Sequence, residues 1–183
     1  MGGSPANIAV GLSRLGKKCG FFARISHDRF GEFVETFLRR RGLTPPISGR
    51  VLTGRAWGLT FTEILSHDES SILMYRNGVA DLSLCPEDID EDYLKEAKAI
   101  LISGTALAAS PSREAALKAV ALAKKNGLRI IFDIDYRAYN WKNEDEMFDL
   151  IHQMRTRMIK SPRLCYGQAR GCDPLRAHDA WSD

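Results

Sequence analysis

The sequence contains no long apolar run, and its cysteines and histidines are few and scattered. No segment approaches the ~18 consecutive apolar residues of a membrane-spanning helix, so we expect no membrane partner. The opening residues lack a basic segment followed by an apolar one, so we expect no signal peptide. The four cysteines form no C-x-x-C pair. This spacing argues against a zinc site or a disulfide framework and favours the reducing cytoplasm.

Most of the chain also lacks a surplus of one charge sign. Residues 1–153 hold 20 basic and 20 acidic residues, whereas residues 154–183 hold 6 basic and 3 acidic ones and carry the whole net charge of +3. Because nucleic-acid-binding domains show a basic patch or stripe, the neutral body predicts no nucleic-acid partner. The length of 183 residues, 44% of them apolar, is enough for a domain with its own core.

The hydrophobic pattern alternates between helical and strand periodicity, which is typical of an α/β fold. It predicts helices over 4–15, 29–41, 86–97, 111–126 and 144–153, and strands over 19–25, 99–103 and 129–135. Asp28 is the predicted N-cap of the second helix. That helix carries an apolar stripe of Phe30, Phe33, Val34, Phe37 and Leu38. The last two strands are apolar throughout and flank a helix, so they predict a βαβ crossover in a parallel sheet. Residues 56–65 and 71–76 alternate across a polar turn, which predicts an antiparallel hairpin outside that sheet.

The periodic pattern ends near residue 153. Residues 154–183 show no sustained period and contain two prolines and two cysteines. A third apolar strand should follow the helix at 144–153, and the sequence indicates none. We therefore expect a domain over 1–153 and a divergent, poorly ordered tail over 154–183, from a foreign reading frame or an alternative end.

The first of four candidate sites is the opening loop. Gly2 and Gly3 let a ligand approach the backbone, and the helix start that follows supplies unpaired N–H groups. Asn7 offers both a donor and an acceptor to a hydroxyl group. The same residues also fit a tight turn before a helix with Ser4 as its N-cap and Pro5 in its first turn. Both interpretations stay open.

The second candidate follows the strand at 129–135. Asp133, Asp135 and Arg137 lie at its carboxyl end, where open parallel sheets place their ligands. This position favours a ligand site, and the alternative is an ion pair that anchors a loop.

The third and fourth candidates also follow strands. Arg76 comes after the hairpin, before the turn signal Asn77-Gly78, as a binding residue or a solvated edge charge. Gly104 follows the strand at 99–103, where a glycine admits a ligand or merely permits the turn.

Together these stretches resemble the signatures of the ribokinase-like (PfkB) carbohydrate kinases. GGSPANIAVGLSRLG, WGLTFTEI, ILMYRNGVADL, SGTALAASPSREA and FDIDYRAYNWKN occur in the family's order and spacing, from residue 2 to about residue 147. The resemblance implies a truncated Rossmann-like α/β fold, in which helices flank a parallel sheet. It also implies a small β-sheet lid, formed by the hairpin at about 55–77.

The resemblance further implies transfer of the γ-phosphate of ATP, with Mg²⁺, to a hydroxyl of a sugar or sugar acid. The substrate-binding residues that it implies are Gly2, Gly3, Asn7, Tyr75, Arg76, Gly104 and Arg137. The glycine pair and the asparagine would contact substrate hydroxyls, and the tyrosine and first arginine would reach the substrate from the lid. The guanidinium of Arg137 would contact the acid end, since it matches a carboxylate in bidentate geometry.

Two parts of the family pattern do not occur in the sequence. One is the strand before the glycine pair, with its sugar-binding aspartate. The other is D-T-x-G-A-G-D, which supplies the family's general base and anion-binding helix start. We therefore assign no catalytic residue and expect a cytoplasmic chain that carries the substrate-binding half of a kinase.

Two alternatives to this expectation remain. One is an inactive fragment that binds a sugar acid or a full-length subunit. The other, a different Rossmann-like nucleotide binder, is disfavoured because GGSPAN follows no strand and lacks the G-x-G-x-x-G spacing. In each case we expect a homo-oligomer to form through the lid or an exposed sheet edge.

Overall fold

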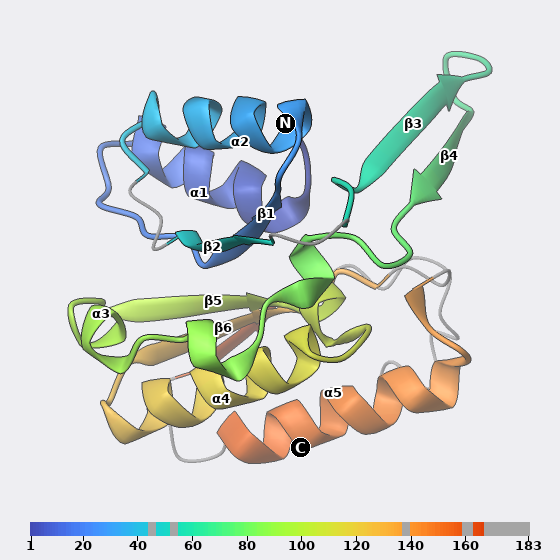
Figure 1. Cartoon of the computed structure of the whole chain (residues 1–183). Coiled ribbons are helices and arrows are strands. Elements are labelled where there is room, and N and C mark those ends of the chain that lie inside the picture. Colours follow the sequence, from blue (N-terminus) through green and yellow to red (C-terminus); the bar gives the residue numbers. More distant parts are fainter. Residues whose placement is uncertain (44–46, 52–54, 137–139, 159–162, 167–183) are drawn as a thin grey trace. The chain divides into compact units, whose positions relative to one another are not determined.

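The computed structural model describes residues 1–43, 47–51, 55–136, 140–158 and 163–166, with the backbone alone at 47–51, 155 and 163–166. The chain divides into two compact units. The first comprises Met1 and Ala9–Leu84, and the second comprises Gly2–Ile8 and Cys85–Asp183. The described strands form three small sheets, and with the helices they make an α/β fold (Figure 1).

The first unit contains two helices and two of the small sheets. The helices are α1 (Ser4–Arg14), whose first residues belong to the second unit, and α2 (Arg29–Arg39). One of the sheets is a parallel pair of strands, β1 (Ala23–Ser26) and β2 (Ile47–Val51). Strand β1 is shorter than the predicted span of 19–25, because its pairing with β2 begins at Ala23.

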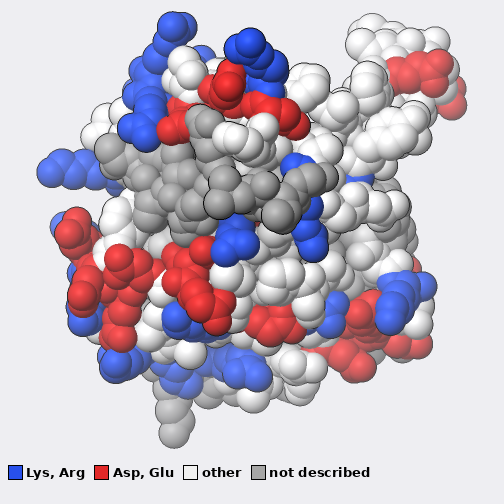
Figure 2. Space-filling model, in the orientation of Figure 1, with Lys and Arg blue, Asp and Glu red and all other residues white. Residues whose placement is uncertain are grey.

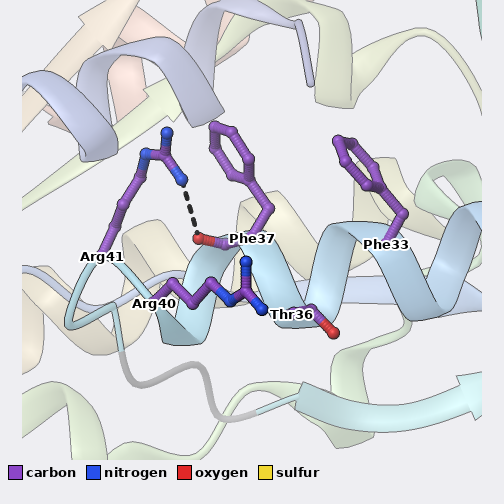
Figure 3. A pocket seen from close by; sticks show the side chains of 5 residues that line it. All are labelled: Phe33, Thr36, Phe37, Arg40 and Arg41. Atoms are coloured by element: carbon purple, nitrogen blue, oxygen red, sulfur yellow. Dashed lines mark hydrogen bonds between the residues drawn. The ribbon is translucent and has the colours of Figure 1, made fainter.

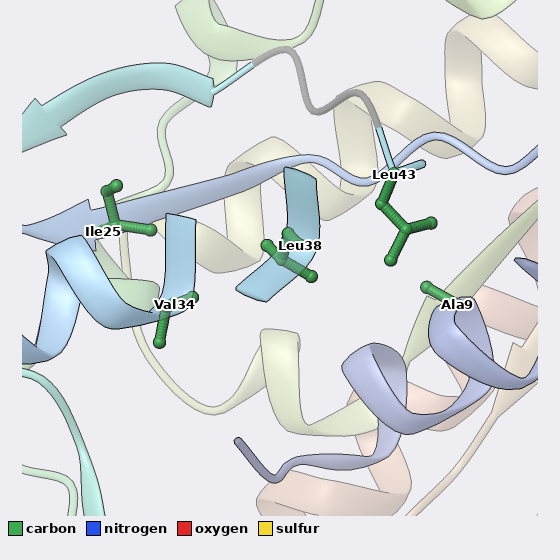
Figure 4. Close-up of a cluster of buried hydrophobic side chains, with 5 residues drawn as sticks. All are labelled: Ala9, Ile25, Val34, Leu38 and Leu43. Carbon is green, nitrogen blue, oxygen red and sulfur yellow. The ribbon is translucent and has the colours of Figure 1, made fainter. Parts of the chain in front are cut away.

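A small apolar core holds the first unit together. Its buried members are Ala9, Ile25, Val34, Leu38 and Leu43 (Figure 4). The predicted stripe of α2 is wider than the face that this core buries, because Phe30 and Phe33 of that stripe are 52% and 55% exposed.

Helix α2 begins as its sequence predicts, with Asp28 as N-cap. Oδ1 of Asp28 accepts a hydrogen bond from the Gly31 amide at 2.9 Å and from Ser26 Oγ at 2.7 Å. The Ser26 hydroxyl is the main reason that the pKa of Asp28 lies below its ordinary value, and the backbone N–H groups at the helix start add to the effect.

The predicted hairpin is confirmed. Strands β3 (Leu59–Ile64) and β4 (Ser70–Tyr75) pair antiparallel, with Leu59 opposite Tyr75 and Phe61 opposite Leu73. Because successive side chains of a strand point to opposite faces, these four side chains share one face of the hairpin. A 3₁₀ turn, η1 (Asp81–Ser83), follows.

The second unit contains the predicted βαβ crossover. Strand β5 (Ala99–Ser103), the 3₁₀ turn η3 (Gly104–Leu107), helix α4 (Ser112–Lys125) and strand β6 (Arg129–Asp133) follow one another. Strands β5 and β6 are parallel, and α4 packs against both (Figure 1). The predicted strands and α4 are confirmed, except that β6 ends at Asp133 instead of residue 135.

The helix predicted over 86–97 is wrong as a single element. The structure has a 3₁₀ turn, η2 (Pro86–Asp88), and then a separate short helix, α3 (Glu91–Lys95). Asp90 has extended backbone dihedrals, and its carboxylate accepts hydrogen bonds from the amides of Asp92 and Tyr93. The side chain thus caps a new helix instead of continuing the old one.

The prediction that no strand follows residue 153 is also wrong. Helix α5 (Glu144–Met158) runs past 153, and strand β7 (Arg163–Tyr166) pairs parallel with β6. A strand of this length is too short to show a hydrophobic period. The division into a domain over 1–153 and a tail over 154–183 stays a prediction, since 159–162 and 167–183 lie outside the described residues.

The surface carries both charge signs. Figure 2 shows acidic and basic side chains interspersed over the visible face, in keeping with the equal counts of the two signs in residues 1–153. Among the described residues, no helix is long and apolar enough to cross a membrane.

Candidate functional site

The start of α1 leaves the predicted glycine pair open to solvent. Gly2, Gly3 and Asn7 are exposed, and a Cβ added at either glycine would meet no atom within 4 Å. Gly3 has a φ of +95°, a left-handed conformation that favours glycine. Its carbonyl oxygen accepts the Asn7 amide, so Gly3 occupies the N-cap position and the prediction of Ser4 as N-cap is wrong.

Ser4 instead bonds to the sheet. Its Oγ donates to Oδ2 of Asp133 at 2.9 Å, and Asp133, the last residue of β6, is only 8% exposed. The predicted alternatives for Asp133 were a ligand site and an anchoring ion pair. The structure adds a third role, a hydrogen bond that ties the first turn of α1 to the carboxyl end of β6.

Gly104 lies at the same edge of the sheet. Ser103, the residue before it, is the register partner of Asp133. A Cβ at Gly104 would lie 2.0 Å from the carbonyl oxygen of Ile134, so the glycine allows the ends of β5 and β6 to approach closely. This supports the structural interpretation of Gly104 and leaves its contact with a ligand a prediction.

These groups form a candidate site within the second unit. Gly3 leads to Ser4, Ser4 bonds to Asp133, and Asp133 pairs in register with Ser103 beside Gly104. The site offers N–H groups of a helix start, a side-chain amide and hydroxyl groups. Such groups can bind the hydroxyls of a polar ligand.

The exit of β6 has an unusual backbone. Asp135 has a φ of +37°, in the left-handed region that few residues other than glycine adopt. Backbone conformations of this kind cluster at functional sites. Arg137, the predicted partner of an acid group, lies outside the described residues.

Tyr75 and Arg76 belong to the first unit. The Arg76 side chain is 17% exposed, and its Nη2 and Nε lie 2.7 and 3.1 Å from Oδ2 of Asp81. The interpretation of Arg76 as a solvated edge charge is therefore wrong. Tyr75 is 59% exposed and meets the ring of Phe61 edge to face, with 6.0 Å between ring centroids.

Two of the pockets among the described residues lie in the first unit. One, of about 500 Å³, lies on the hairpin face formed by Leu59, Phe61, Leu73 and Tyr75. The other lies on α2, where Arg41 stacks over the ring of Phe37 and donates to its carbonyl oxygen (Figure 3). Its volume of about 110 Å³ is below the roughly 300–1,000 Å³ typical of small-molecule sites.

Arg113 has a structural role in the second unit that the sequence patterns did not predict. Nε of Arg113 donates to the carbonyl oxygen of Leu107 at 2.7 Å, and its Nη2 lies 3.0 Å from Oε1 of Glu146. Arg113 thereby holds the end of η3, which begins at Gly104, and it lowers the pKa of Glu146. The sequence did offer one signal: Arg113 lies in the first turn of α4, where the helix dipole favours an anion over a cation.

The described residues do not gather a cluster of metal-ligating side chains. No group of three or more His, Cys, Asp or Glu among them could hold a metal ion.

The model of the pfkB family carbohydrate kinases matches residues 1–158. The chain belongs to the PfkB family of carbohydrate kinases. The resemblance of the sequence motifs is thus confirmed over most of the chain.

Similar PfkB proteins include two 5-dehydro-2-deoxygluconokinases. The one from Clostridium perfringens is 66% identical over 147 residues, which cover 80% of this chain and 44% of that protein. The one from Listeria monocytogenes is 57% identical over 146 residues, which cover 80% of this chain and 45% of that protein. The chain thus spans less than half the length of these curated relatives.

Solved PfkB-type structures match the fold over a similar extent. An uncharacterized sugar kinase from Pyrococcus horikoshii superposes with a TM-score of 0.74 at 32% identity, covering 84% of this chain and 52% of that one. A PfkB protein from Polaromonas sp. JS666 gives a TM-score of 0.76 at 28% identity, covering 85% and 53%. The Pyrococcus horikoshii kinase has also been solved in complex with ATP.

Proposed function

We propose that this chain carries the substrate-binding part of an ATP-dependent sugar-acid kinase. The reaction is phosphorylation of a sugar-acid hydroxyl, such as one of 5-dehydro-2-deoxygluconate. The identity of 66% with the Clostridium perfringens enzyme supports this substrate. The observation that carries the proposal is the Ser4–Asp133 bond, which brings the exposed glycine pair to the carboxyl end of a parallel sheet.

The roles of the residues follow from their chemistry. Backbone N–H groups at Gly2 and Gly3 and the side-chain amide of Asn7 bind substrate hydroxyls. Tyr75 and Arg76 bind the same substrate from the hairpin, which acts as a lid on a Rossmann-like domain. Arg137 pairs with the carboxylate of the sugar acid.

The proposal includes further expectations for the whole protein. ATP and Mg²⁺ are its cofactors; when bound, they supply the phosphoryl group and neutralise its charge. The site residues named above bind and orient the acceptor sugar. A kinase of this substrate acts in inositol catabolism and works in the cytoplasm.

Calorimetric titration of the chain with 5-dehydro-2-deoxygluconate tests this proposal. We expect saturable binding that Asn7→Ala weakens about tenfold, since a lost hydrogen bond costs about 1 kcal/mol or slightly more. Asn7 is exposed, so its removal should leave the fold intact. Arg14→Ala, at the other end of α1, is the matched control and should bind normally. A wild-type chain that binds no sugar acid contradicts the proposal.

A second candidate function is binding without catalysis. It is favoured by the sequence given, in which the D-T-x-G-A-G-D motif that supplies the family's general base does not occur. A coupled assay of ADP formation, with sugar acid and ATP present, separates the two functions. Steady ADP production supports a kinase, whereas binding of the sugar acid without ADP supports a binding or subunit-interaction module.

A further inference from the structure

The Ser4–Asp133 hydrogen bond joins two elements that lie 129 residues apart in the sequence. Ser4 is in the first turn of α1, and Asp133 is the last residue of β6. Within the part of the chain that the structure describes, the Ser4 hydroxyl is the side-chain group that donates to this carboxylate. The bond is therefore a specific link between the helix start and the sheet.

The surroundings make this bond stronger than an average surface contact. Asp133 is only 8% exposed, so a carboxylate oxygen without a donor there would lose hydration and gain nothing in return. Hydrogen bonds to a charged acceptor are stronger than those between neutral groups. The partial positive charge at the start of α1 adds to the attraction.

The bond also determines how the substrate-binding groups are presented. Residues three apart are neighbours on a helix surface, so fixing the Ser4 side chain fixes the rotation of the face that carries Asn7. Gly2 and Gly3 immediately precede Ser4, and an added Cβ on either would meet no atom within 4 Å. Loss of the Ser4 bond would thus free the opening loop and Asn7 together.

We propose that Ser4 and Asp133 are positioning residues. Through their hydrogen bond they hold Gly2, Gly3 and Asn7 in the orientation that binds a hydroxyl of the sugar acid. This role rests on the proposed function, because it assumes that the start of α1 contacts the sugar. Neither side chain needs to touch the substrate.

Hydrogen exchange of the full chain without ligand tests the bond itself. Exchange at the Asn7 amide, which donates to Gly3 O, is measured in Ser4→Ala and Ser4→Thr. Alanine is the better helix former, so without the bond to Asp133 the Ser4→Ala change would slow exchange. The positioning role predicts the opposite, exchange about tenfold faster. Threonine keeps the hydroxyl and should restore the wild-type rate.

Titration of the same variants with 5-dehydro-2-deoxygluconate tests the consequence. We expect Ser4→Ala to weaken binding about tenfold and Ser4→Thr to bind like the wild type. Arg14→Ala in the same helix should leave both the exchange rate and the affinity unchanged. Faster exchange in Ser4→Ala together with weaker binding, both reversed by Ser4→Thr, supports the positioning role.

The other outcomes overturn it in distinguishable ways. Unchanged or slower exchange in Ser4→Ala shows that the bond does not hold the helix start, regardless of how the variant's affinity for the sugar acid changes. Faster exchange with unchanged affinity shows a structural bond that does not serve the ligand. A wild-type chain that binds no sugar acid contradicts the proposed function, and the positioning role fails with it.

Discussion

An added Cβ at Gly104 would lie 2.0 Å from the carbonyl oxygen of Ile134, closer than two such atoms can approach. Gly104→Ala must therefore displace backbone at the ends of β5 and β6. We expect it to lower the free energy of unfolding by about 1–3 kcal/mol, the usual cost of overpacking. Urea unfolding followed by circular dichroism measures the change.

Gly11→Ala is the matched control for this substitution. Gly11 lies within α1, and a Cβ there would meet no atom within 4 Å. Alanine in a helix interior is about 0.5–1 kcal/mol more favourable than glycine, so this variant should be stabilised. Equal effects of the two substitutions would show that the approach of Gly104 to Ile134 is not a constraint.

The cap of α2 should make stability depend on pH. Because the folded pKa of Asp28 lies below its ordinary value, the ionised carboxylate stabilises the fold above its unfolded pKa. That contribution is lost as pH falls through the folded pKa. Asp28→Asn keeps a capping oxygen and lacks the charge. We expect this variant to be less stable than the wild type at pH 7 and equally stable once the carboxylate is protonated.

Urea unfolding of the two proteins between pH 7 and pH 3 checks this expectation. Asp28→Ala, which removes the cap at every pH, should be destabilised by about 1 kcal/mol at pH 7. A difference between wild type and Asp28→Asn that stays constant over the whole range would mean that the charge of Asp28 contributes nothing.

Arg113→Met should destabilise the second unit. Arg113 is 24% exposed, and its loss leaves the carbonyl oxygen of the buried Leu107 without that donor. We expect a cost of about 1–3 kcal/mol in the free energy of unfolding. The pKa of Glu146 should also rise towards its ordinary value, since the Arg113 hydrogen bond is the main cause of its lowering.

Arg29→Met provides the control for this change. Arg29 is 95% exposed and pairs with Glu32, and exposed pairs of this kind contribute little. We expect its stability to stay within about 0.5 kcal/mol of the wild type. If both arginine variants lost the same stability, the hydrogen bond from Arg113 to the Leu107 carbonyl oxygen would not contribute specifically to the fold.

The hairpin should mediate self-association. Phe61 and Leu73 lie opposite one another on one face and are each 56% exposed. Exposed apolar patches favour association. We expect sedimentation velocity to show oligomers of the wild type that the double substitution Phe61→Ser and Leu73→Ser shifts towards monomer. Ile72→Ser, on the opposite face, serves as the comparison, and a monomeric wild type at high concentration would rule the interface out.

Local patterns were enough to predict the elements whose signals are strong over several residues. The strands at 99–103 and 129–133 were found from their continuous apolar runs, and the strands of the hairpin were found from their alternation. Asp28 was found because capping depends on residues within one turn. The PfkB motifs were found because their order along the chain is visible in the sequence.

Features that depend on distant partners could not be predicted in this way. The partner of Ser4 is 129 residues away, and the local pattern favoured a capping role for it. Strand β7 is too short to show a period, and its pairing with β6 stabilises it. Phe33 belongs to an apolar stripe, but tertiary packing decides which part of that stripe is buried, and its side chain is left 55% exposed.

Binding of a sugar acid at the start of α1 is tested most directly by NMR titration of the ¹⁵N-labelled chain with 5-dehydro-2-deoxygluconate. We predict saturable shifts of the Asn7 side-chain amide and the Gly104 backbone amide, with the amide of Lys125, at the far end of α4, unmoved. Absence of saturable binding, or binding that leaves both the Asn7 and Gly104 signals in place, would contradict it.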